Sequence, residues 1–204
     1  MGILLLWMGL RLMIERRSLS WNYQLLDSSC RSIPIMSEIR LTSNGEYAPV
    51  ALKVDTGATN ISIPSRHFGL KSDADILRVF PYAKPELHCG IDSTSIIRYY
   101  KVVANSIKIT RDRYELVGLP ISITADPRVK IALFGMPALN LFHVDIDTEF
   151  SKITLTENYE LAILRENKVP IFRSKDFFSK FEFSLDDLAA EANYINNLAK
   201  LDNT

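Results

Sequence analysis

The residues of this chain whose types and spacing best fit a chemical role lie between positions 50 and 64. An apolar run at Val50–Val54 has the pattern of a short buried strand, and an Asp-Thr-Gly-Ala turn begins directly after it at Asp55. Gly57 suits a tight loop, and the run Thr59–Ile63 favours a second strand. We therefore expect the Asp55 carboxylate to lie at a strand-to-turn junction that is held on both sides.

An Asp-x-Gly turn often joins two strands without doing chemistry, so the context of Asp55 matters. A second segment, Ala132–Asp147, begins with apolar residues and Gly135, continues as a short helix with Pro137 in its first turn, and ends as a strand. Gly135 would let its strand pass close to the Asp55 loop. In type and order, Val54–Thr59 and Ala132–Asp147 resemble the active-site loop and the later element of retropepsin-like aspartic proteases.

This resemblance covers about Ile35 to Leu155 and implies a mainly β fold, the retropepsin-like acid-protease β-barrel. It also implies an aspartic endopeptidase in which two carboxylates activate a water. The two carboxylates must share one proton, because like charges a few ångströms apart cannot both ionise. The chain holds one Asp-Thr-Gly, so the resemblance implies a C2 homodimer with Asp55 of each subunit on the axis. No metal or organic cofactor is needed.

The resemblance assigns roles to the residues that follow Asp55. The Thr56 hydroxyl would brace the two loops across the axis, and Gly57 would permit the loop geometry. Ala58 and Thr59 would offer backbone groups to a peptide or protein substrate held as an extended strand.

A hairpin expected over residues 87–103 stands where the family carries a flap that closes over the cleft. Under this interpretation Gly90 and Ile91 lie near the flap tip and supply backbone contacts to substrate. The sequence departs here from the simplest members, which have a more glycine-rich flap and a shorter run before it. An ordinary hairpin is the alternative interpretation.

Two other functions stay open. The first is a catalytically silent retropepsin-like module that dimerises and holds peptides, although the intact Asp-Thr-Gly-Ala argues against it. The second is a small membrane-associated protease anchored by its N-terminal segment. Recovery of both the full-length form and a form starting at Met36 in the soluble fraction of cells would exclude the second.

The remaining elements follow from hydrophobic patterning and turn residues. Strands at 35–41 and 47–54 are expected to form a hairpin around Asn44-Gly45, and Pro120 suggests a sheet edge or a bulge. The other expected elements are short helices at 65–69, at 72–80 and from Pro137 through Phe142, strands at 105–109 and 116–123, and a final hairpin over 144–155 in which Asp145 and Asp147 face solvent.

Composition excludes some classes of function. Lysine plus arginine and aspartate plus glutamate number 24 each, so no global charge favours nucleic acid or an anionic membrane. Cys30 and Cys89 have no metal-ligand spacing and form no disulfide framework, which favours a reducing, cytoplasmic compartment. His67, His88 and His143 lack a second ligand at metal-binding spacing, so we expect surface or packing roles for them.

Three domains are expected: an N-terminal apolar extension at 1–34, for which places inside and outside the fold both stay open, the protease domain at 35–156, and a helical C-terminal extension at 157–204. In the tail, Ser184 begins an amphipathic helix, and its apolar stripe suits packing on its own domain or on a partner subunit.

The N-terminal apolar run is interrupted by Arg11, and its basic residues Arg16 and Arg17 follow the run instead of preceding it. Both features disfavour a cleaved signal or a membrane-spanning helix. A packing helix and an unused upstream start, with Met36 as an internal start, both stay open.

Overall fold

The computed structural model describes residues 14–22, 33–89, 96–109 and 114–174. The chain is mainly β, as the sequence predicts, with few and short helices. The strands are β1 (Ser18–Asn22), β2 (Pro34–Arg40), β3 (Ala48–Val54), β4 (Ser62–Pro64), β5 (Pro85–Cys89), β6 (Ile96–Ile109), β7 (Tyr114–Thr124), β8 (Ala132–Phe134), β9 (Phe142–Asp147) and β10 (Lys152–Glu157). The helices are η1 (Ser65–Phe68), α2 (Asp73–Val79), α3 (Met136–Leu139), α4 (Tyr159–Glu166) and η2 (Ile171–Arg173).

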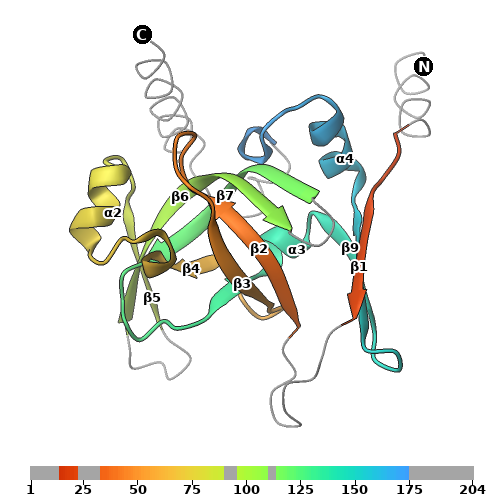
Figure 1. Ribbon diagram of the computed structural model, residues 1–204, viewed down its shortest axis with the longest axis horizontal. Coiled ribbons are helices and arrows are strands. Elements are labelled where there is room, and N and C mark those ends of the chain that lie inside the picture. The colour runs from red at the N-terminus through yellow and green to blue at the C-terminus, as the bar shows by residue number, and fades with distance from the viewer. Residues whose placement is uncertain (1–13, 23–32, 90–95, 110–113, 175–204) are drawn as a thin grey trace.

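Six strands form a closed barrel in the order β2-β3-β8-β4-β7-β6, because β2 also pairs with β6. Strand β5 adds to the outer edge of β6. Figure 1 shows α2 on one side of the barrel and the small β1-β10-β9 sheet with α4 on the other. Barrel closure removes most free strand edges, which otherwise invite pairing with other chains.

The β2–β3 hairpin carries Asp55 at its end and forms as predicted. Antiparallel pairing runs from Pro34↔Lys53 to Ile39↔Ala48. In β2, Ile35, Ser37 and Ile39 are buried while their neighbours face outward, the period-two alternation of a half-buried strand. The buried Ser37 hydroxyl donates to the Val50 carbonyl at 2.8 Å, so its polar group is satisfied.

Strand β6 is one continuous strand of 14 residues, although the sequence suggested a flap strand and a separate strand at 105–109. The expectation that Pro120 marks an edge is wrong, since β7 lies between β4 and β6. The Ser122 N–H points to the β4 side, where it donates to Ile61. The Pro120 nitrogen points the same way, two residues before β4 pairing begins at Ser122, so the missing N–H costs no ladder bond.

A second, three-stranded sheet has the order β1-β10-β9. Strand β1 pairs with β10 in register from Ser18↔Thr156 to Asn22↔Lys152. Leu19 is buried and Trp21 nearly so, and the Trp21 indole donates to the Pro34 carbonyl at 3.2 Å. Residues 18–22 of the N-terminal extension therefore belong to the fold, which the sequence had left open.

The helices lie where the sequence predicts them, but some differ from the prediction in length. Helix α2 begins with the Ser72–Asp75 capping box, in which each side chain accepts from the other's backbone N–H. Helix α3 ends at Leu139 and β9 begins at Phe142, so the expectation of a helix through Phe142 was too long. Helix α4 confirms that the chain turns helical after Glu157. The predicted helix from Ser184 lies outside the described residues.

A buried carboxylate, Glu157, fastens α4 and β1 to the barrel. Its side chain is 0 % exposed and accepts from the Tyr114 hydroxyl at 2.6 Å and from the Arg17 backbone N–H at 2.8 Å. Arg165 of α4 makes two further hydrogen bonds to this carboxylate. Its Nε donates to Glu157 Oε1 at 2.8 Å, and its Nη2 donates to Glu157 Oε2 at 3.1 Å. The charge is therefore fully paired and hydrogen-bonded, the condition under which a buried carboxylate is tolerated.

Candidate active site

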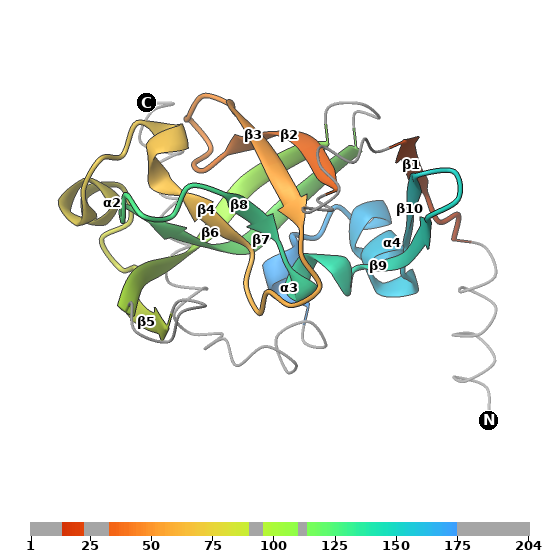
Figure 2. The same cartoon turned by 90° about the horizontal axis from the view of Figure 1, so that it is seen from below.

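The Asp55 loop connects β3 to β4, and both strands lie against β8. Strand β3 pairs with β8 in parallel, with Val54 opposite Phe134, and β4 meets β8 at Ser62↔Leu133. Figure 2 shows the β3–β4 connection running beside β8 and α3. The candidate carboxylate thus lies where three barrel strands meet, as the sequence predicts for a loop held on both sides.

Hydrogen bonds fix the shape of the turn itself. The Asp55 N–H donates to the Phe134 carbonyl at 3.2 Å, which continues the β3–β8 ladder by one residue. The Asp55 backbone carbonyl accepts from the Ala58 N–H at 3.2 Å, and the side-chain Oδ1 of Asp55 accepts from the Gly57 N–H at 2.9 Å. The second of these is an Asx-type contact, which orients one carboxylate oxygen toward the loop's own backbone.

Gly135 carries the close approach that the sequence predicts. A Cβ added there would overlap the Asn60 carbonyl oxygen and lie 2.6 Å from the Ala58 carbonyl oxygen. Directly after it, the Met136 N–H donates to the Ala58 carbonyl at 2.9 Å. The loop is therefore clamped against the start of α3, and only glycine leaves room for the crossing.

The loop presents its centre to solvent. Thr56, Gly57 and Thr59 are exposed, while Asp55 and Ala58 are half-buried. Both backbone groups of Ala58 are engaged within the chain, by Asp55 and by Met136. Ala58 therefore supports the loop, and of the two residues expected to offer backbone groups to substrate, the exposed Thr59 is the more available.

The hairpin predicted as a flap is present as β5 and β6, paired from Pro85↔Tyr100 to Cys89↔Ile96. Gly90 and Ile91, the two residues expected to contact substrate, lie outside the described residues. The strands leading to the flap tip and to Asp55 both run toward the lower side of the molecule in Figure 1.

Two polar contacts, which sequence reasoning missed, hold the first residues of β6, next to the tip of this hairpin. Arg128, in the loop between β7 and β8, donates to the Ile96 carbonyl at 2.9 Å and pairs with Asp126. Arg98 pairs with Asp73 of α2 at 2.9 Å. Guanidinium contacts to nearby acids keep the pKa of Asp126 below its usual value, chiefly through the Arg128 hydrogen bond. An Asp-Pro-Arg turn carries no signal in sequence for such a long-range contact.

The histidines and the acidic residues that the structure describes assemble no metal site. Within the described ranges, no group of three or more His, Cys, Asp and Glu side chains is arranged to hold a metal ion. His67 and His143 are exposed, and burial followed by the nearby Arg66 charge lowers the pKa of His67. His88 lies 3.3 Å from Glu86 and stacks edge-on against Tyr99.

Asp145 and Asp147 have no catalytic surroundings. Asp145 is exposed on β9, as expected. Asp147 is half-buried, and its Oδ1 accepts from the Glu149 and Phe150 N–H groups at 3.0 Å each. These contacts make Asp147 the capping residue of the β9–β10 turn.

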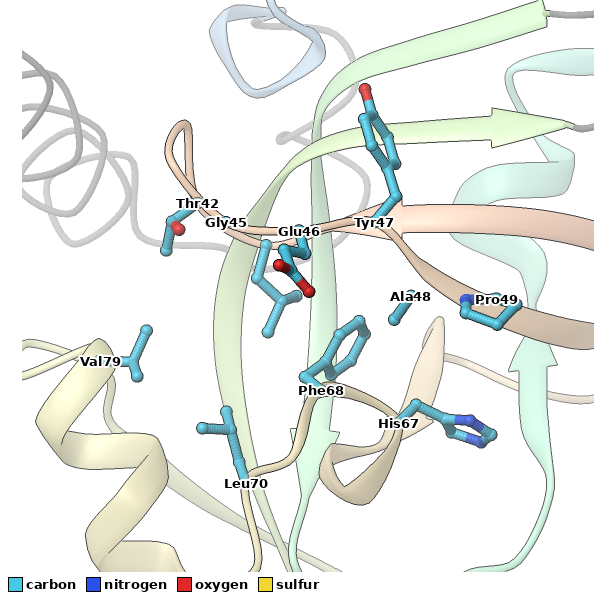
Figure 3. Close-up of a pocket in the computed structure, with 11 residues that line it drawn as sticks. Thr42, Gly45, Glu46, Tyr47, Ala48, Pro49, His67, Phe68, Leu70 and Val79 are labelled. Atoms are coloured by element: carbon cyan, nitrogen blue, oxygen red, sulfur yellow. The ribbon is translucent and has the colours of Figure 1, made fainter.

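A pocket of about 380 Å³ lies away from the Asp55 loop, between the β2–β3 turn and the η1–α2 segment. Figure 3 shows Phe68 and Leu70 facing Glu46 and the β2–β3 turn across this space. None of the residues that line it belongs to the Asp55 loop. Its walls are mainly apolar. The Glu46 carboxylate and the His67 imidazole both line it, and in Figure 3 the His67 ring points away from Glu46.

No protein-family model matches the chain, and no curated protein matches it. Among the helices of the described residues, none has the length and apolar character needed to cross a bilayer.

Proposed function

We propose that the chain is an aspartic endopeptidase of the retropepsin-like type that acts as a homodimer on peptide or protein substrates. The observation that carries this proposal is the Asp55 turn, clamped by Phe134, Gly135 and Met136 at the meeting point of three barrel strands. A rigid, half-buried carboxylate with one oxygen oriented by a backbone N–H is prepared for acid–base chemistry. A plain turn would not need the glycine crossing.

The proposed reaction uses Asp55 and the partner subunit's Asp55, which share one proton. The ionised carboxylate takes a proton from a water as the water oxygen attacks the scissile carbonyl carbon. The protonated carboxyl gives its proton to the carbonyl oxygen, which produces a gem-diol. The carboxyl that is now protonated gives its proton to the amide nitrogen, and the ionised carboxylate takes a proton from a gem-diol hydroxyl. The C–N bond then breaks to give a carboxylic acid and an amine, and the dyad again holds one proton.

Neighbouring residues have supporting roles in this proposal. Thr56 is exposed on the turn, and its hydroxyl would brace the two loops across the axis. Gly57 supplies the N–H that orients the Asp55 carboxylate. Thr59 offers backbone groups to an extended substrate, and Ala58 holds the loop to α3.

The free edge of β9 supports the homodimer. Within the described residues β9 pairs with β10 alone, so its other edge presents unpaired backbone groups. Helix α3 links this strand directly to Gly135 and hence to the Asp55 loop. Antiparallel pairing of β9 with its copy would form an isologous interface that brings the two loops toward one axis.

Ile146, on β9, is 40 % exposed and suits a test of that interface. Ile146→Lys should weaken dimerisation at least about tenfold, because burying a lysine costs more than 1.4 kcal/mol. Sedimentation across a range of concentrations would measure it. Phe150→Lys, a matched change at a 68 % exposed position in the β9–β10 turn, should leave dimerisation unchanged. Equal dimerisation of wild type and Ile146→Lys would reject β9 as the interface.

The function itself is tested by cleavage of a diverse peptide library with the full chain between mildly acidic and neutral pH. The full chain is required, because a form starting near residue 35 would lack β1. We expect cleavage activity that rises faster than linearly with enzyme concentration. This activity should be lost in Asp55→Asn and kept in Glu149→Gln. A folded, dimeric wild type as inactive as Asp55→Asn would favour the silent peptide-binding module instead.

A further inference from the structure

A second concave surface lies on the side of the barrel opposite α2, between α4 and β7. This α4–β7 groove measures about 360 Å³. Its residues come from the chain before β1, from β7, and from the α4–η2 segment that is coloured blue in Figure 1. The lining includes the apolar side chains of Leu116, Val117, Leu161 and Ile171 and the basic side chains of Arg17 and Lys168.

The floor of the α4–β7 groove is apolar and partly open. Val117 is 45 % exposed, although it lies in the middle of a barrel strand. Gly118, the next residue, has φ +66°, and a Cβ there would lie 2.6 Å from the Pro170 Cβ. The chain after α4 therefore packs tightly on β7 at this point, and the apolar strip beside it stays uncovered by the described residues.

The rim of the α4–β7 groove is basic. Arg17 and Lys168 are exposed, and no carboxylate pairs with either side chain among the described residues. Arg165 is held by Glu157 and Glu166. The one acid in the lining, Glu115, already accepts from Ser106 and Tyr47. The surface thus suits an occupant with an apolar stripe and negative charge beside it.

The chain itself carries such an occupant. Residues 184–201 follow a helical pattern with apolar residues on one face, and residues 184–204 contain four acidic residues against one lysine. Ser174 is the last described residue and lies three residues after Ile171, which lines the groove. Nine residues lie between Ser174 and Ser184, and this connection spans at most about 35 Å, so the tether starts beside the groove and is long enough to reach along it.

We propose that residues 184–201 dock as an amphipathic helix in the α4–β7 groove of their own chain, with acidic residues 186 and 187 against Arg17 and Lys168. A helix of this length is marginal alone in water, so docking is what would stabilise it. The short tether gives an effective concentration in the millimolar range, which favours the chain's own groove over that of a second copy. This inference is independent of the proposed protease activity.

Hydrogen exchange of the full-length chain, followed by mass spectrometry, tests the proposal. In the wild type, the exchange rates of amides 184–198 should be lower than in the free peptide 184–201 by a factor of about ten or more. Both the groove variant Arg17→Glu/Lys168→Glu and the tail variant Asp186→Lys/Asp187→Lys should lose this protection. The four substitutions combined should restore it, because the attraction returns with reversed signs.

Two further variants make the test specific. Leu188→Asp, on the apolar stripe of the tail, should abolish protection without affecting the barrel. Asp202→Lys, the same type of charge change beyond the proposed helix, should leave protection unchanged. Equal exchange of wild-type tail and free peptide would overturn the proposal. Protection that appears only as protein concentration rises would overturn docking within one chain and assign the groove to a second copy.

Discussion

Two carboxylates, Asp55 and Glu157, occupy opposite kinds of surroundings in the same chain. Glu157 is 0 % exposed and accepts from Tyr114, from Arg165 and from the Arg17 backbone, so both its oxygens are occupied. Asp55 is half-buried, and one described hydrogen bond, from Gly57, reaches its side chain. The backbone of Asp55, by contrast, is fixed through Phe134 and Ala58.

The difference separates a structural carboxylate from a candidate catalytic one. Saturating a carboxylate with donors stabilises its charged form and leaves it nothing to exchange with a substrate. Fixing the backbone while leaving the side chain under-coordinated keeps the position and preserves reactivity. Substitution of Glu157 should therefore change stability, and substitution of Asp55 should change activity.

Asp55→Asn should have the largest effect. Peptide cleavage should fall at least about 10³-fold, because the dyad loses its ability to act as base and acid. The free energy of unfolding should change by no more than about 0.5 kcal/mol, since the Oδ1 contact to Gly57 survives in an amide. Parallel cleavage assays and urea unfolding would measure both. A comparable loss of stability would remove the distinction between the two carboxylates.

Glu157→Gln should show the converse pattern. The Arg165 guanidinium, whose side chain is 17 % exposed, would lose its main partner, and unfolding free energy should fall by about 3 kcal/mol. Activity per folded molecule should stay close to wild type. Urea denaturation measures the loss, and Glu149→Gln on the exposed β9–β10 turn is the matched control. An unchanged denaturation midpoint would show that the network does not stabilise the fold.

Gly135→Ala tests the clamp on the Asp55 loop. The added methyl would meet the Ala58 and Asn60 carbonyls, so stability should fall by about 1–3 kcal/mol and activity should drop beyond what the folded fraction explains. Gly69→Ala is the comparison, because Gly69 has φ +74° with no atom within 4 Å of its added Cβ. Activity measured at temperatures where each variant is fully folded would separate the two. Full activity in Gly135→Ala would mean that loop position is not critical.

The smallest expected effect is a loss of folding stability in acid that depends on Glu157. Hydrogen bonds from Arg165, Arg17 and Tyr114 outweigh the effect of burial and lower the Glu157 pKa from its ordinary value of 4.5. The unfolded chain therefore binds the proton first, so this contribution to stability is complete above about pH 4.5 and is lost as pH falls through the folded pKa. Wild type should destabilise more steeply than Glu157→Gln below pH 4.5. Parallel slopes in thermal unfolding would contradict this.

Local sequence patterns were enough to predict the β2–β3 hairpin, the Asp55 turn and the Gly135 crossing. Each depends on neighbouring residues, on turn chemistry or on one glycine between strands. The contacts of β1 with β10 and of Glu157 with Tyr114 could not be predicted, because pairing across more than a hundred residues leaves no local periodicity. Pro120 misled for a related reason, since whether its nitrogen faces a paired residue depends on where the distant strand β4 begins.

The parallel β3–β8 pairing and the β1–β10 pairing impose an order on biosynthesis. Asp55 has no partner strand until Phe134 has been made, and β1 waits for residues up to Glu157. At ribosomal rates that interval is on the order of ten seconds. A nascent chain thus carries the Asp55 sequence long before it has the clamp that shapes the turn. If the proposed activity holds, the site stays latent on the ribosome, and the growing chain and its neighbours are protected from cleavage during synthesis.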